Sequence, residues 1–221
     1  MLLDEALDLI LHHAAVPGRQ VVPLAHSGGR VCTENNQASH PLPGYDQSTR
    51  DGYAVRGPGR TCGLGRQAFA LRGEIPAGFV HQIDIDPGEA YQIMTGGLLP
   101  VGSERVIAQE NCHISGPDLI VEETVLASPG RFIRTRGSEH QAGEPLVEPG
   151  TRLNESHLAL LAAAGNATVE VFNQPKVAFF CSGSELVMAE NTLQSGQKYS
   201  SNHLLLESLI TRFGGQAEGY G

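Results

Sequence analysis

Residues 46–57 read Asp46-Gln47-Ser48-Thr49-Arg50-Asp51-Gly52-Tyr53-Ala54-Val55-Arg56-Gly57, which combines two carboxylates, two hydroxyls and a tyrosine without a long apolar run. Asp51-Gly52 followed by Tyr-Ala-Val predicts a tight turn that leads into a strand. A polar turn anchored by a strand can present a functional site. The alternative is that Asp51-Gly52 is an ordinary hairpin turn with no chemical role.

Short strands separated by turns are predicted after this run. Gly and Pro clusters, such as Pro76-Ala77-Gly78 and Pro87-Gly88, mark the turns. The predicted strands cover residues 67–72, 90–94, 105–109 and 119–122. Strands at this spacing indicate a small all-β domain, a barrel or a sandwich, over residues 46–139.

The flanking segments predict a discontinuous α+β domain, formed by residues 1–45 and 140–174. Apolar residues at helical spacing predict an amphipathic helix near the N-terminus, ended by Pro17-Gly18. Strands are expected at 20–24, 131–134 and 169–172. Asn154 can cap a helix over 155–164, and Gly165 suits the position just after it.

Residues 175–221 predict the start of a further, parallel α/β domain. The apolar run 176–181 is typical of a buried parallel strand followed by a loop, and a helix is expected over 202–213, ended by Gly214-Gly215. One strand and one helix cannot complete a parallel sheet, so we expect either a fragment or a segment that packs on something else. The predicted fold is therefore mixed α/β and multidomain, with the β domain inserted in the α+β domain.

Composition limits the classes of function. The 221 residues carry a formal net charge of −9, which argues against a nucleic-acid-binding face but allows a local site for a small anion. No apolar run approaches the roughly 18 residues of a membrane span, and the N-terminus lacks the positive charge of a secretory signal. The four scattered cysteines form no C-x-x-C pair, which favours reduced thiols in a cytoplasmic protein.

Three groups of residues suggest an oxyanion and metal site. Thr95-Gly96-Gly97 offers a hydroxyl and backbone N–H groups to an anion, or is only a structural turn. Ser182-Gly183-Ser184 follows a predicted buried strand, where α/β sheets place ligands, and a following helix N-terminus could hold a phosphate there; the alternative is a plain connection. Asp51, Glu139 and Glu185 can supply oxygen ligands to Mg²⁺, or be solvated surface carboxylates.

Six ordered segments resemble motifs of the MoeA family, the molybdopterin molybdenumtransferases, which are related to the gephyrin E domain. Residues 46–55 resemble D-x-S-x-x-D-G-Y-A-V, and 72–78 resemble G-x-x-x-A-G. Residues 88–102 resemble I-M-T-G-A-x-x-P-x-G, with Gly97 in place of Ala, and 106–110 match V-V-x-x-E. Residues 133–153 resemble N-I-R-x-x-G-E-D-x-x-x-G…G-T-x-L, and 182–187 resemble S-T-G-D-E-L. Ordered motifs are far more specific together than any one alone.

The resemblance implies an activity, an assembly and roles for residues. MoeA proteins insert molybdate into adenylylated molybdopterin with release of AMP, and they are homodimers in the cytoplasm. Their site lies between the β domain of one subunit and the MoaB/MogA-like molybdopterin-binding domain of the other. By motif, Asp51 and Glu185 are implied as catalytic residues and Glu139 and Glu185 as Mg²⁺ ligands. The implied anion-binding residues are Ser48, Thr95, Gly96, Ser182, Gly183 and Ser184.

The sequence departs from the family pattern at several of these positions. Arg50 replaces Met, Glu139 replaces Asp, Ser184 replaces the Asp of T-G-D-E-L, and Tyr199-Ser200-Ser201-Asn202 stands at Y-D-x-N. The family's G-G-x-S loop and C-terminal β domain are not reached. Two hypotheses remain: a molybdenumtransferase, with molybdopterin adenylyltransferase as a possible partner, or a non-catalytic binding or scaffold module. This chain alone is not expected to form a complete pocket.

Overall fold

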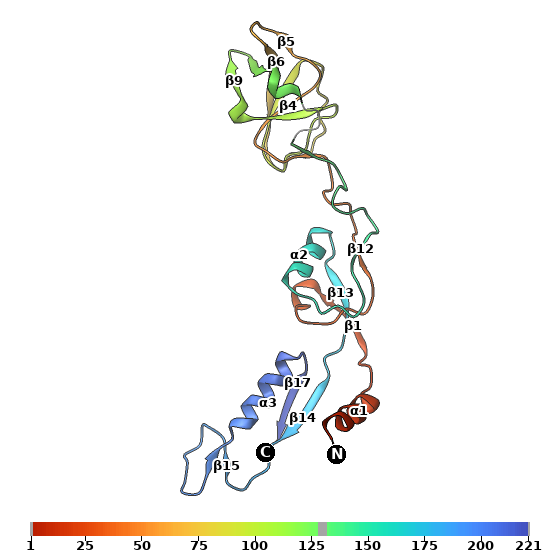
Figure 1. The fold of residues 1–221 in the computed structure, drawn as a ribbon, viewed down its shortest axis with the longest axis vertical. Coiled ribbons are helices and arrows are strands. Elements are labelled where there is room, and N and C mark those ends of the chain that lie inside the picture. The colour runs from red at the N-terminus through yellow and green to blue at the C-terminus, as the bar shows by residue number, and fades with distance from the viewer. Residues whose placement is uncertain (1, 128–131, 221) are drawn as a thin grey trace. The chain divides into compact units, whose positions relative to one another are not determined.

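The computed structural model describes residues 2–127 and 132–220, which divide into two compact units. One unit is the continuous segment Ala38–Glu144, and the other combines Met1–Gln37 with Pro145–Gly221. Figure 1 follows the chain through both. Helices and strands are mixed, as predicted. Within the described ranges, no helix has the length and apolarity needed to cross a membrane.

The Ala38–Glu144 unit is built on one seven-stranded sheet. Its strands are β4 (Gly52–Val55), β5 (Arg60–Thr61), β6 (Arg66–Ile75), β7 (Glu89–Ile93), β8 (Arg105–Ala108), β9 (Cys112–Ser115) and β10 (Asp118–Glu122). They lie in the order β8-β4-β7-β6-β10-β9, with β5 paired to β6. Neighbouring strands are antiparallel except β6 and β7, which are parallel. The four strands predicted between residues 67 and 122 are present, while β5 and β9 were not predicted.

Strand β4 is buried on both of its faces. Tyr53 and Val55 belong to a hydrophobic cluster that includes Phe69 of β6 and Leu119 of β10. Between them, Ala54 points into a second cluster with three other buried residues, Ile93, Leu99 and Val106. Alternate side chains of a strand point to opposite faces, so β4 joins two cores. The sheet that contains β4 is curled (Figure 1). The polar turn before β4 is therefore anchored by a fully packed strand.

The same unit contains a two-stranded pair, β3 (Gln47–Ser48) with β11 (Ile133–Arg134). Since β3 pairs with β11, and β4 pairs with β7 and β8, the chain between β3 and β4 is not a hairpin. The alternative of an ordinary hairpin turn at Asp51-Gly52 is therefore wrong. Of the strand predicted over 131–134, residue 131 lies outside the described residues.

The second unit begins with α1 (Leu3–His13) and contains two antiparallel strand pairs. These are β1 (Arg19–Pro23) with β13 (Thr168–Phe172), and β2 (Asn36–Gln37) with β12 (Pro145–Val147). Helix α2 (Glu155–Ala163) packs with them on a core that includes Leu24, Cys32, Leu153, Leu161 and Val171. Short 3₁₀ helices in the two units are η1 (Leu24–His26), η2 (Gln109–Asn111) and η3 (Glu123–Ala127).

Helix α2 begins at the predicted residue and ends at Ala163, one residue before the predicted end. The Asn154 side chain accepts a hydrogen bond from the His157 backbone N–H at 3.0 Å, which satisfies one of the free amides of the first turn. Gly165 follows the helix with φ +84°, the left-handed conformation that glycine adopts without a steric penalty.

Residues 175–220 form a small parallel pair with a helix. Strand β14 (Lys176–Phe180) lies parallel to β17 (Gln216–Tyr220), and α3 (Ser201–Arg212) lies between them in sequence. Strands β15 (Leu186–Val187) and β16 (Lys198–Tyr199) form a second parallel pair. The expectation of a single strand here is wrong, because β17 was missed. The expectation of burial is also wrong, since only Phe179 of β14 is buried.

Candidate functional site

The side chain of Asp51 is fixed by one residue, Thr95, which follows β7. Asp51 Oδ1 accepts a hydrogen bond from the Thr95 backbone N–H at 2.7 Å and a second from Thr95 Oγ1 at 2.7 Å. Asp51 Oδ2 has no hydrogen bond to any described residue. Asp51 is exposed, so its carboxylate is held through one oxygen and open to solvent at the other.

Both hydrogen bonds from Thr95 lower the pKa of the Asp51 carboxyl, the backbone one most and the hydroxyl one next. Donors that point at a carboxylate favour its charged form. Desolvation opposes these two hydrogen bonds and is the smallest of the three effects on the pKa. Asp51 is thus a fixed negative charge at neutral pH, suited to bind a cation or to accept a hydrogen bond.

Ser48 shapes the turn from inside. It is 1% exposed, and its Oγ donates a hydrogen bond to the Arg50 carbonyl at 2.5 Å and accepts one from the Arg50 N–H at 3.2 Å. The Ser48 hydroxyl is therefore engaged with the backbone of Arg50, within the same turn. The guanidinium of Arg50 lies 5.7 Å from the centre of the Phe132 ring, within the range of a cation–π contact.

The three amides of Thr95-Gly96-Gly97 are all used inside the unit. Thr95 donates to Asp51, Gly96 donates to the Ser48 carbonyl at 2.8 Å, and Gly97 donates to the Met94 carbonyl at 2.9 Å. The expectation of free N–H groups at this turn is therefore wrong. Gly96 has φ +80° with open space where a Cβ would stand, so the turn brings bare backbone to the surface beside the Thr95 side chain.

Glu139 lies in the same unit but is already paired. Its Oε1 accepts a hydrogen bond from Arg134 Nη1 at 2.8 Å, and both side chains are about half exposed, 51% and 47%. A surface ion pair contributes little to stability, but it occupies one of the two Glu139 carboxylate oxygens that could otherwise bind a metal ion.

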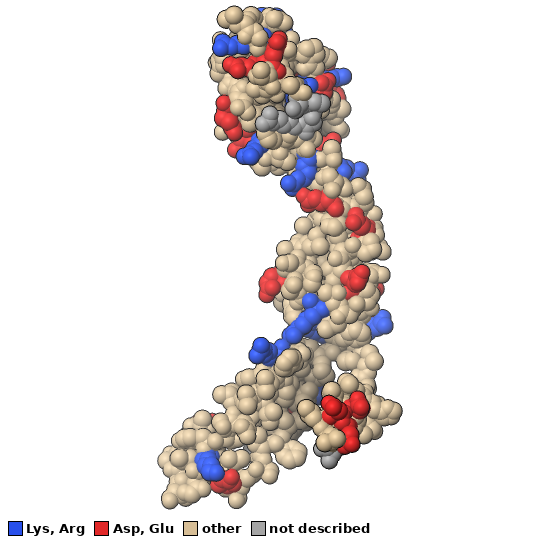
Figure 2. All heavy atoms as spheres, viewed as in Figure 1, with Lys and Arg blue, Asp and Glu red and all other residues tan. Residues whose placement is uncertain are grey.

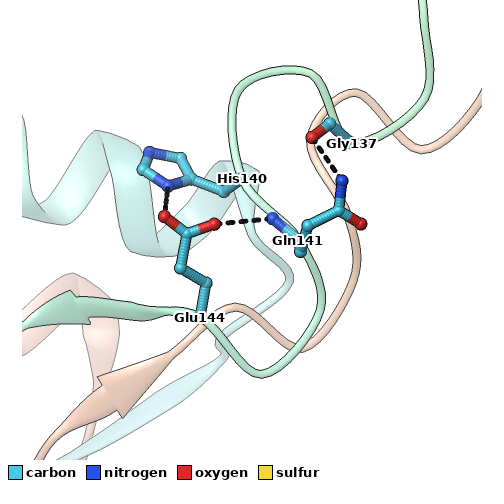
Figure 3. A network of polar contacts seen from close by, with 4 residues as sticks. All are labelled: Gly137, His140, Gln141 and Glu144. Atoms are coloured by element: carbon cyan, nitrogen blue, oxygen red, sulfur yellow. Dashed lines mark hydrogen bonds and ion pairs between the residues drawn. The ribbon is translucent and has the colours of Figure 1, made fainter.

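A second polar network links Gly137, His140, Gln141 and Glu144 in the loop that follows β11 (Figure 3). Glu144 accepts hydrogen bonds from the Gln141 backbone N–H at 2.8 Å and pairs with His140 Nδ1 at 3.2 Å. The Gln141 side chain donates to the Gly137 carbonyl at 2.7 Å. The hydrogen bond from the Gln141 backbone N–H is the main cause of the lowered pKa of Glu144, followed by the hydrogen bond from His140. Glu144 is therefore ionised at neutral pH and stabilises the conformation of this loop through its two hydrogen bonds.

The segment 182–185 lies in the other unit, beside a hollow of about 420 Å³. Ser182 and Glu185 line it together with Lys198, Asn202 and the residues between them. Gly183 and Ser184 are exposed but lie outside the lining. No helix directly follows this segment, contrary to the expectation, because β15 comes next.

The N-terminus of α3 nevertheless lines the same hollow. Ser200, Ser201 and Asn202 at the start of α3 are among its lining residues, since β15 and β16 pair and bring residues 186 and 198 together. No side chain caps this helix. The Glu185 carboxylate and the Lys198 ammonium make no hydrogen bond or ion pair within the described residues. The hollow therefore offers an acid, a cation and a helix N-terminus.

The described residues contain no group of three or more His, Cys, Asp or Glu side chains that could hold a metal ion. Glu139 and Glu185, the two predicted Mg²⁺ ligands, belong to different units. On the face seen in Figure 2, acidic and basic side chains are interleaved and no extended basic surface is present.

Two contacts of this site were not predicted. Tyr45 donates its hydroxyl to the Gly96 carbonyl at 3.1 Å, and Phe132 lies under Arg50. Both link residues far apart in the sequence, so no local spacing signals them. In the sequence, the only sign of the first contact is Tyr45, an aromatic residue between Pro43-Gly44 and Asp46.

Comparison with known proteins agrees with these motifs. Residues 1–165 match the family model of the MoeA N-terminal region (domain I and II). A molybdopterin molybdenumtransferase of Nostoc is 33% identical over 199 residues, which is 89% of this chain and 45% of that protein. The molybdopterin molybdenumtransferase of Haemophilus influenzae is 31% identical over 211 residues, 95% of this chain and 51% of that protein.

Solved structures are similar over the whole chain. A crystal structure of the molybdopterin biosynthesis MoeA protein from Pyrococcus horikoshii OT3 has a TM-score of 0.83 at 30% identity, covering 99% of this chain and 58% of that one. A second structure of the P. horikoshii protein gives a TM-score of 0.76, also at 30% identity, with 99% and 56% covered. The chain spans about half the length of the curated relatives it matches. With a family model matched over residues 1–165 and relatives of this similarity, the chain belongs to the MoeA family.

Proposed function

We propose that the protein acts in molybdenum cofactor biosynthesis, in the insertion of molybdate into adenylylated molybdopterin with release of AMP. Family membership and the names of its relatives, molybdopterin molybdenumtransferases, support this activity. The observation that carries the proposal is the Asp51–Thr95 pair. It presents an ionised carboxylate with one fixed and one open oxygen at the first motif of the family.

The role of Asp51 follows from its geometry. Because Oδ1 is held twice by Thr95, the carboxylate does not need to reorganise when it meets a substrate or a bound cation, and preorganised charges of this kind stabilise charge that develops in a reaction. Thr95 positions Asp51, and Ser48 and Gly96 support the turn. Arg50 adds a positive charge one residue away, which suits an anionic substrate.

The hollow beside Glu185 is proposed to take the phosphate and pterin end of the substrate. Lys198 and the α3 N-terminus are attractive to a phosphate, and Ser182 offers a hydroxyl. Glu185 can supply one carboxylate to Mg²⁺, which usually binds through one or two carboxylates together with substrate phosphates. Mg²⁺ would supply positive charge to offset the anions. Glu139 fits this role less well, because Arg134 already holds one of its oxygens.

The finer arrangement is part of the proposal. The β domain is inserted in an α+β domain, which is followed by a molybdopterin-binding domain. The protein is a cytoplasmic homodimer in which the β domain of one subunit and the molybdopterin-binding domain of the other form the two sides of the site. Molybdopterin adenylyltransferase is its partner. No nucleic acid or membrane takes part.

The test is titration of the protein, at defined oligomeric state, with adenylylated molybdopterin and molybdate in the presence and absence of Mg²⁺, with AMP measured by chromatography. With Mg²⁺ present, binding should weaken at least about tenfold in Asp51→Asn and in Glu185→Gln, since each removes a carboxylate that would attract the cation bridging to the anionic substrate. Asp86→Asn, an exposed carboxylate of the same unit as Asp51, is the matched control. Unchanged AMP release and unchanged binding in Asp51→Asn would together reject the role proposed for Asp51.

A non-catalytic binding or scaffold module is the second candidate. It is favoured by Ser184 and Ser200, which stand where the family pattern has acidic residues. A folded protein that binds neither molybdate nor adenylylated molybdopterin would support this alternative.

A further inference from the structure

A separate hollow of about 250 Å³ lies in the unit formed by Met1–Gln37 and Pro145–Gly221. It shares no lining residue with the hollow beside Glu185. Apolar side chains of Val31, Phe172 and Phe213 line it together with two arginines, Arg30 and Arg152. A mostly apolar pocket with a few convergent polar groups is typical of a small-molecule site.

Backbone carbonyls hold both guanidinium groups in place. Arg30 Nη2 donates to the Phe172 carbonyl at 2.7 Å. Arg152 donates from Nε to the Gly29 carbonyl at 3.1 Å and from Nη2 to the Arg212 carbonyl at 2.8 Å. These bonds leave most N–H donors of both groups free. The guanidiniums are therefore oriented before any ligand arrives.

Neither arginine is neutralised by a carboxylate. Within the described residues, no Asp or Glu oxygen lies within 4.0 Å of the Arg30 or Arg152 guanidinium. Arg30 is partly buried, so water solvates its charge only in part. Two uncompensated positive charges in one hollow are notable in a chain of net charge −9, and they create a local field that attracts anions.

We propose that this hollow binds a small carboxylate or phosphate that carries an apolar group. The anion lies between the Arg30 and Arg152 guanidiniums, whose planar forks match carboxylate and phosphate oxygens. The apolar group packs against Val31, Phe172 and Phe213. The volume lies below the about 300–1,000 Å³ typical of pockets for drug-sized ligands, so the ligand is about the size of a single ring with its anionic group. This site is independent of the proposed function at Asp51 and Glu185.

Binding would also join distant parts of the unit. Gly29 and Arg30 come from the loop after η1, Arg152 precedes α2, and Phe213 with Gly214 follows α3. A ligand that contacts all three stabilises their association through its binding free energy.

The probes are benzoate, phenyl phosphate, inorganic phosphate and benzyl alcohol, added to the full chain without molybdate or molybdopterin. Binding is measured by calorimetry and by the NMR shifts of the Val31 methyl groups. Benzoate or phenyl phosphate should bind with saturation and shift Val31, and the comparison between them distinguishes carboxylate from phosphate. Inorganic phosphate should bind more weakly, since it lacks the apolar group.

The Arg30→Gln and Arg152→Gln variants should each weaken binding at least about tenfold, the loss expected for a charge-assisted hydrogen bond. Arg60→Gln removes one positive charge from the other unit and should leave binding unchanged. If Arg30→Gln does not fold, Arg30→Lys keeps the charge without the fork, and an affinity loss in this variant supports the proposal. Benzyl alcohol binding as tightly as both benzoate and phenyl phosphate would overturn the proposal, as would unchanged affinity in folded Arg30→Gln or unshifted Val31 methyls with either anionic probe at millimolar concentration.

Discussion

Gly52, the first residue of β4, faces the carbonyl oxygen of Ile107 on β8 so closely that a Cβ built on Gly52 would lie 2.0 Å from that oxygen. The two strands pair at this point, with Gly52 opposite Ala108. Only a residue without a side chain allows the polar turn of residues 46–51 to pass this close to β8. The glycine that follows Asp51 is therefore required by packing, apart from any chemical role of its neighbour.

Gly52→Ala is expected to lower the free energy of unfolding by about 1–3 kcal/mol or more, as overpacking of a buried site does, because backbone atoms rather than a flexible side chain must move. Urea unfolding followed by circular dichroism measures the loss. Gly73→Ala is the control, since the nearest atom to its built Cβ is 3.9 Å away on Tyr91. Equal stability of the two variants would contradict the steric argument.

The pKa of Asp51 should depend on Thr95. Because the Thr95 N–H and hydroxyl lower this pKa from 3.8, the unfolded chain binds the proton more tightly. The stabilising contribution is present above about pH 3.8 and is lost as pH falls through the lowered folded value. In Thr95→Val the hydroxyl donor is gone, so the pKa should move back toward 3.8.

An NMR titration of the Asp51 carboxyl carbon measures this shift. Thr61→Val, an exposed threonine on β5, should leave the titration of Asp51 unchanged. A Thr95→Val protein with the titration curve of the wild type would show that the hydroxyl does not contribute.

Arg50→Met, which restores the residue of the family pattern, should weaken the binding of molybdate if this turn binds an anion. The expected change is several-fold, because Arg50 lies on the surface and its charge is screened by salt. Titration at low and moderate ionic strength measures it, and Arg66→Met provides a matched loss of charge elsewhere on the same unit. Unchanged binding would make Arg50 a solvated charge that stacks on Phe132.

The four free thiols should differ in reactivity. Burial, with a smaller effect of Glu110, raises the pKa of Cys112 to about 11, and since the thiolate is the reactive form, Cys112 should label slowly below that pH. Cys62 is exposed and Cys32 is buried, so Cys62 should label first and Cys32 last. Maleimide labelling with peptide mapping by mass spectrometry gives the order. Faster labelling of Cys112 than Cys62 at pH 8 would contradict the structure.

Asn154→Ala should destabilise α2 by about 1 kcal/mol, the usual effect of losing a side-chain N-cap. The loss arises because the His157 amide then has no protein acceptor. Urea unfolding of the variant is compared with Asn191→Ala, whose exposed side chain makes no hydrogen bond to another described residue. A similar stability for both variants would show that water caps this helix equally well.

Features set by local chemistry were predicted from the sequence, and features set by distant contacts were not. Asn154 and Gly165 bound α2 because capping depends on residues within one turn. Strand β17 was missed because Gln216-Ala217-Glu218-Gly219-Tyr220 has no β-branched residue, and it forms only through pairing with β14.

The candidate site shows the same division. The sequence indicated Asp51 and Thr95 as site residues, but the bonds that join them span 44 positions, so neither the shared oxygen nor the use of all three turn amides could be foreseen. The phosphate site predicted after β14 is not followed directly by a helix. The pairing of β15 with β16, which the sequence does not signal, decides that the α3 N-terminus lines the hollow beside Ser182 and Glu185.

The segment Ala38–Glu144 interrupts the unit formed by Met1–Gln37 and Pro145–Gly221, and its two ends lie side by side. Ala38 donates to the Glu144 carbonyl at 2.9 Å, Gly143 donates to the Ala38 carbonyl at 2.8 Å, and Gln37 pairs with Pro145. Once the segment Ala38–Glu144 has folded, the ends of β2 and β12 are already together. The insert therefore removes most of the loop-closure entropy that would oppose pairing of β2 with β12. For the unit that contains β2 and β12, the folded segment Ala38–Glu144 therefore acts as a short closed loop that keeps these two strands in register.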